Sequence, residues 1–64
     1  MADKYNFIRL EKAEGLGHLY LDIDEISTFY DVGVKGAVKM KDGTVYDVWE
    51  NAERISELIQ RRLR

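Results

Sequence analysis

The sequence contains no cysteine and no proline. Without a thiol, the chain can form neither a disulfide nor a thiolate metal site, and it has no cysteine nucleophile. The absence also fits a reducing compartment. Without proline, no rigid turn or proline-rich linker divides the 64 residues, so we treat residues 1–64 as one domain. A domain of this size lies near the lower limit for independent folding.

A basic excess and long apolar runs are missing as well. Ten Lys and Arg residues face twelve Asp and Glu residues, which gives a net charge of -2 at pH 7. Nucleic-acid binders usually carry a basic excess, so nucleic acid is disfavoured as a partner. No apolar run approaches the ~20 residues of a membrane span. Because Met1 to Asn6 lack the apolar segment of a secretion signal, we expect a cytoplasmic protein.

Reactive side chains are scarce. His18 is the only histidine, and a metal site around it would need carboxylates such as Asp22 or Asp24. An ordinary polar histidine on a strand is the simpler interpretation. Asp22, Asp24 and Glu25 lack the spacing of a calcium-binding loop. We therefore expect no catalytic residue, no metal and no cofactor, and a function that is not enzymatic.

The strongest structural signal is the stretch Val38 to Asn51. Apolar and polar residues alternate on both sides of Asp42-Gly43, which predicts a hairpin. A two-residue turn would place Asp47 beside Val38 on the buried face, which is costly. A three-residue loop with a bulge at Gly43 avoids this, so we predict it. The buried face then carries Val38, Met40, Tyr46 and Val48, and the opposite face carries Lys39, Lys41, Val45, Asp47 and Trp49.

We expect three further strands before the first strand of this hairpin. Alternation or β-rich composition predicts Tyr5–Glu11, His18–Asp24 and Glu25–Val32 as strands, with a helical turn around Asp24–Ile26 as an alternative. The inward face of the first strand stays open, since either Ile8 and Leu10 or Phe7 and Arg9 could face the core. Gly33 and Gly36 predict a loop or bulge before a strand at Ala37–Lys41.

The C-terminal segment reads as a capped amphipathic helix. Asn51 is a favoured N-cap residue, and apolar residues follow at helical spacing along one stripe, namely Ala52, Ile55, Leu58, Ile59 and Leu63. Together these segments predict an α+β fold. It is a small antiparallel β-meander of about four to five strands with one C-terminal helix packed on one face.

Candidate binding residues lie on the face turned away from this helix. Val45, Trp49, Lys39 and Lys41 would form a surface for another protein, including a second copy of the chain in a homodimer. Alternatively, Trp49 tucks against the helix start or against Phe7. Lys35, Lys39 and Lys41 could instead bind RNA or a small anionic ligand.

Two segments carry a resemblance to a known family. Tyr20–Ile26 (YLDIDEI) and Lys41–Ile55 (KDGTVYDVWENAERI) resemble the small flagellar FlbD-like proteins. In that family a Tyr/Phe-Leu-Asn strand, an isoleucine, an Asn-Gly hairpin and a Tyr-x-Val-x-Glu-Ser helix start occur in this order. The resemblance covers about residues 8–59. It implies a small non-enzymatic accessory protein, bacterial or from a bacteriophage, with no catalytic residues.

A second, shorter similarity implies a different function. Gly33–Gly36 followed by a strand, and a terminal helix with Glu53, Ile55 and Ile59, is similar to the carbon-storage-regulator family of RNA-binding dimers. That similarity keeps an RNA-binding regulator as the alternative. Because the chain is acidic overall, protein binding is the leading functional hypothesis.

Overall fold

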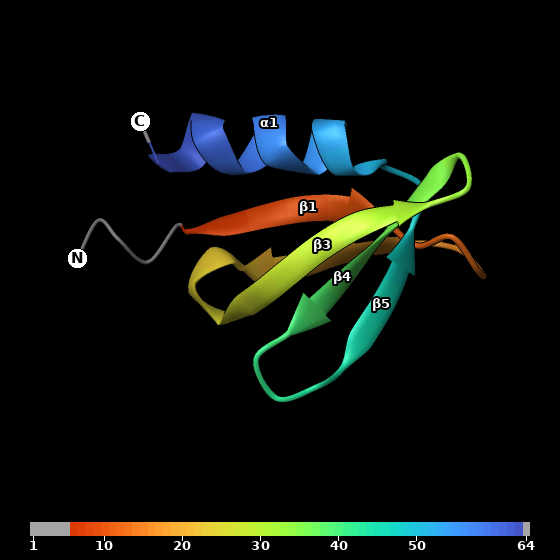
Figure 1. Cartoon of the computed structure of the whole chain (residues 1–64), viewed down its shortest axis with the longest axis horizontal. Coiled ribbons are helices and arrows are strands. Elements are labelled where there is room, and N and C mark those ends of the chain that lie inside the picture. Colours follow the sequence, from red (N-terminus) through yellow and green to blue (C-terminus); the bar gives the residue numbers. More distant parts are fainter. Residues whose placement is uncertain (1–5, 64) are drawn as a thin grey trace.

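The computed structural model describes residues 6–63, and it confirms the predicted α+β architecture. Five antiparallel strands and one C-terminal helix follow each other along the chain (Figure 1). The elements are β1 (Phe7–Glu11), β2 (His18–Asp22), a 3-10 turn (Ile23–Glu25), β3 (Ile26–Val32), β4 (Lys35–Met40), β5 (Val45–Val48) and α1 (Ala52–Leu63).

The strands form two sheets that meet at one corner. One sheet contains β1 and β2, and the other has the order β3-β4-β5. The end of β1 runs alongside the end of β5: the Trp49 amide donates to the Glu11 carbonyl, and the Ala13 amide donates to the Asp47 carbonyl, both at 3.0 Å. The spatial order is therefore β2-β1-β5-β4-β3, and β1 and β5 separate beyond this corner.

The hairpin between β4 and β5 has the predicted bulged loop. Lys39 pairs with Val45, the Met40 amide donates to the Thr44 carbonyl at 2.7 Å, and Gly43 has a φ of 97°. The Asp42 carboxylate accepts a hydrogen bond from the Thr44 amide at 2.9 Å. This bond stabilises the charged carboxylate and lowers the pKa of Asp42 below its ordinary value.

Two predicted strand boundaries are wrong. The second strand ends at Asp22 rather than Asp24, because the Asp22 side chain accepts the Asp24 amide at 3.0 Å and caps a 3-10 turn. The third strand begins at Ile26, since Glu25 lies in that turn. The alternative of a helical turn in this region is therefore the better one. Tyr5, the predicted start of the first strand, lies outside the described residues.

The predicted loop over Gly33–Gly36 is also wrong in extent. Val32 pairs directly with Lys35, so the connection is a two-residue turn at Gly33 and Val34. Gly33 has a φ of 64°, as expected for glycine at the first central position of a tight hairpin turn. Gly36 is buried and already belongs to β4. The β4 strand consequently begins at Lys35 and ends at Met40.

The core lies between the strands and α1. The helix contacts β1, β3 and β4, and Asn51 caps it as predicted, since its side-chain oxygen accepts the Arg54 amide at 2.9 Å. Ile8 and Leu10 form the inward face of β1, whereas Phe7 and Arg9 face outward. The core cluster is Ile8, Leu10, Leu21, Val38, Val48 and Ile55, with Met40, Tyr46, Leu58 and Ile59 packed at its margin. The side chain of Leu63 is not among those described.

Replacing Ile55 with alanine should strongly destabilise the fold. Its side chain is fully buried in the core cluster, and truncation of such a residue costs about 2–5 kcal/mol of unfolding free energy. Leu58→Ala is the matched control, because Leu58 is only half-buried and should lose less. Urea unfolding of both variants measures the difference. Equal stability of wild type and Ile55→Ala would contradict the packing of α1 on the strands.

Candidate interaction surfaces

The face of the three-stranded sheet that points away from the core is the first candidate surface, which we call the outer face. Cross-strand pairing places its residues in rows: Tyr30 beside Ala37, and Ala37 beside Asp47. Ala37 is buried in the middle of the face. Around it lie Thr28, Tyr30, Val32, Lys35, Lys39, Val45, Asp47 and Trp49, and Lys41 follows at the end of β4.

Trp49 is the largest side chain on the outer face, and it is half-exposed. Its accessible fraction is 51%, and those of Val45, Val32 and Tyr30 are 47%, 46% and 43%. The Lys35 ammonium lies 4.8 Å from the centroid of the indole ring. Such a contact is worth about 0.5–1 kcal/mol at an exposed site. Of the two predicted placements of Trp49, the exposed one is therefore correct.

The charge of the outer face differs from that of the whole chain. Among the strand residues of this face, Lys35 and Lys39 stand against Asp47, and Lys12 and Glu14 add one charge of each sign beside Val45 and Asp47. The face therefore has a small positive excess, whereas the chain has a net charge of -2. The structure thus brings Lys35, Lys39, Val45 and Trp49 onto one surface, and Lys41 lies in the turn that follows β4. Sequence reasoning missed Tyr30 and Val32, although alternation along the third strand, paired against Lys35, would have placed them here.

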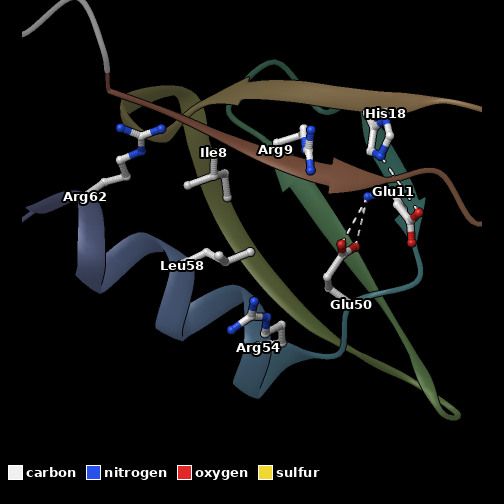
Figure 2. Close-up of a pocket in the computed structure, with 8 residues that line it drawn as sticks. All are labelled: Ile8, Arg9, Glu11, His18, Glu50, Arg54, Leu58 and Arg62. Atoms are coloured by element: carbon white, nitrogen blue, oxygen red, sulfur yellow. Dashed lines mark hydrogen bonds and ion pairs between the residues drawn. The ribbon is translucent and has the colours of Figure 1, made fainter.

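A cleft between β1 and α1 is the second candidate surface (Figure 2). It has a volume of about 400 Å³, and its walls are Ile8, Arg9, Glu11 and His18 from the first two strands and Glu50, Arg54, Leu58 and Arg62 from the C-terminal segment. The helical residues are four positions apart, so they share one side of α1. The cleft was not predicted from the sequence, although the four-residue spacing of Arg54, Leu58 and Arg62 was an available signal.

Charges in the cleft separate into an acidic and a basic part. Both carboxylate oxygens of Glu50 accept the Glu11 amide, at 3.1 and 3.2 Å. The Glu11 carboxylate lies 3.8 Å from the His18 imidazole. Arg54 pairs with Glu57 at 3.0 Å. Within residues 6–63, no carboxylate forms an ion pair with Arg9 or Arg62.

Asp22 and His18, the residues considered as metal ligands, make other contacts in the structure. Asp22 caps the 3-10 turn, and His18 faces Glu11 at the edge of the cleft. Among residues 6–63, no three His, Asp or Glu side chains gather closely enough to hold a metal ion. In the same part of the chain, no helix has both the length and the apolar character needed to cross a membrane.

Comparisons with known proteins add no relative. No protein-family model, no curated protein and no solved structure matches the chain. The function must therefore be argued from the two surfaces themselves.

Proposed function

We propose that the chain is a non-enzymatic module that binds another protein through its outer face. The observation that carries this proposal is the half-exposed Trp49 with Lys35 stacked over its ring. Tryptophan and tyrosine are enriched among the residues that contribute most to protein interfaces. The resemblance to FlbD-like proteins supports a role as a bacterial or bacteriophage accessory factor. Such a factor would act in the cytoplasm.

The composition of the outer face matches the usual anatomy of an interface. Its apolar residues, Trp49, Tyr30, Val32 and Val45, are partly exposed around a buried alanine, and the lysines lie between and beside them. Interfaces commonly combine an apolar or aromatic centre with a polar rim. Because positive charge is in excess on this face, the complementary partner surface should be apolar at its centre and acidic at its edge.

Trp49→Ala should abolish capture of the partner. Truncation removes the largest apolar contact and the ring under Lys35, while the half-exposed side chain contributes little to the core. Immobilised wild type and variant would be exposed to a bacterial lysate and the bound proteins quantified by mass spectrometry. Leu16→Ala is the matched control, since Leu16 is 94% exposed in the β1–β2 connection and outside the outer face.

Three outcomes would contradict the proposal. Wild type could retain no protein specifically, Leu16→Ala could lose binding to the same degree as Trp49→Ala, or nuclease treatment of the lysate could remove the bound material. The last result would favour RNA. Lys35 and Lys39 lie on the same face as Tyr30 and Trp49, Lys41 follows in the next turn, and lysines beside exposed aromatic rings suit single-stranded nucleic acid. Complexes with RNA or a small anion would also weaken steeply with salt.

A second copy of the chain is one partner that fits the outer face. A homodimer with two-fold symmetry would bury Val45 and Trp49 against their counterparts and add apolar burial on the side of the sheet opposite the small core. Analytical ultracentrifugation at about 100 µM, where micromolar dimers are populated, should then show a dimer. Trp49→Ala should convert it to a monomer. A wild-type monomer at this concentration would exclude self-association as the function of the face.

A further inference from the structure

We propose that the cleft between β1 and α1 binds an extended, acidic segment of a partner protein, which adds to the open edge of β1 as a strand. This second site does not involve the outer face. The proposal is carried by three features: the edge of β1, the arginines beside it, and the apolar floor between β1 and α1.

The backbone of β1 presents one edge that β2 does not use. The Ile23 amide donates to the Asn6 carbonyl at 2.9 Å, and the Lys12 amide donates to the Gly17 carbonyl at 3.2 Å. Given the antiparallel register, even-numbered residues of β1 bond to β2 and odd-numbered residues point their backbone groups to the other side. Those residues are Phe7, Arg9 and Glu11.

The part of this edge without a partner strand begins on the Arg9 side of Glu11, where β5 no longer runs beside β1. Trp49 still pairs with Glu11, but the chain then turns into α1 at Ala52. Within residues 6–63, no strand lies beside Phe7 and Arg9 on this side. Unpaired strand edges are templates for another strand, and an incoming segment antiparallel to β1 would continue the line of β5.

The chain itself shows how an acidic group is held at this edge. The Glu50 carboxylate accepts the Glu11 amide with both oxygens. Glu11 is the β1 residue next to the unpaired part of the edge. Arg9 and Arg62 flank the next part of the edge (Figure 2). Guanidinium groups bind carboxylates in a two-pronged geometry. Carboxylates of a partner would therefore meet positive charge beyond Glu50, and basic side chains would be repelled.

The floor of the cleft and an adjoining hollow accept apolar side chains. Ile8 and Leu58 lie between the arginines in Figure 2. Next to the cleft, Phe7, Tyr20, Arg9 and Arg62 line a hollow of about 320 Å³. Arg9 and Arg62 belong to both spaces. Because side chains alternate along a strand, a bound segment with acidic and apolar residues in alternation matches this surface.

The test uses eight-residue peptides with glutamate at every second position and valine, threonine or tyrosine between. Titration into ¹⁵N-labelled protein should shift the amide signals of Phe7 to Glu11 and of residues 54–62, and should slow hydrogen exchange at Phe7 and Arg9. Arg9→Glu and Arg62→Glu should each weaken binding about tenfold. Arg61→Glu, the same charge change on an exposed helical residue outside the cleft, should have a much smaller effect.

Two altered peptides separate strand addition from charge attraction. A peptide with lysine in place of glutamate should not bind, and a glutamate peptide N-methylated at alternate residues should lose binding because its strand hydrogen bonds are blocked. The proposal is overturned if the N-methylated peptide binds equally well, if the signals that shift belong to the outer face, or if Arg61→Glu weakens binding as much as Arg62→Glu. It is also overturned if ATP or single-stranded RNA occupies the cleft while no peptide does.

Discussion

The structure depends on the junction Glu50–Ala52, where the chain passes from the end of β5 into the first residue of α1. Gly36 lies directly against the Glu50 carbonyl oxygen, where a Cβ atom would overlap with it. The Glu50 side chain holds the end of β1 through the Glu11 amide, and the Asp31 carboxylate of β3 accepts the Ala52 amide at 2.8 Å. Contacts from β4, β1 and β3 therefore converge on one short segment and set the direction of the helix.

Both candidate surfaces follow from this junction. Trp49 immediately precedes it, so its side chain remains on the outer face beside Lys35 while the chain turns to the opposite side. The direction of α1 places Arg54, Leu58 and Arg62 along β1 and so forms the cleft. The same turn takes the chain away from the edge of β1 after Glu11. A small domain with one core thus has an aromatic, basic face on one side and an arginine-lined cleft on another.

Local patterns predicted the parts of the fold that depend on near neighbours. The bulged hairpin followed from the cost of burying Asp47, and the start of α1 followed from the capping side chain of Asn51. Alternation along β5 predicted the face on which Trp49 lies, but left its exposure open. Gly36 was misread as a loop residue, because glycine in a sequence cannot distinguish a turn from a close contact with a distant carbonyl. The cleft was missed because it joins Arg9 to helical residues that are more than forty positions away in the chain.

The stability of Gly36→Ala tests the role of the junction most directly. The added methyl group must displace the Glu50 carbonyl, so we expect a loss of about 1–3 kcal/mol, as for other overpacked sites, and faster hydrogen exchange at the Glu11 and Ala52 amides. Gly33→Ala is the matched control, because its added methyl group meets no atom within 4 Å; it strains only the positive φ of an exposed turn and should leave the protection of the Glu11 and Ala52 amides unchanged. A Gly36→Ala variant with wild-type stability and unchanged protection at both amides would contradict the account.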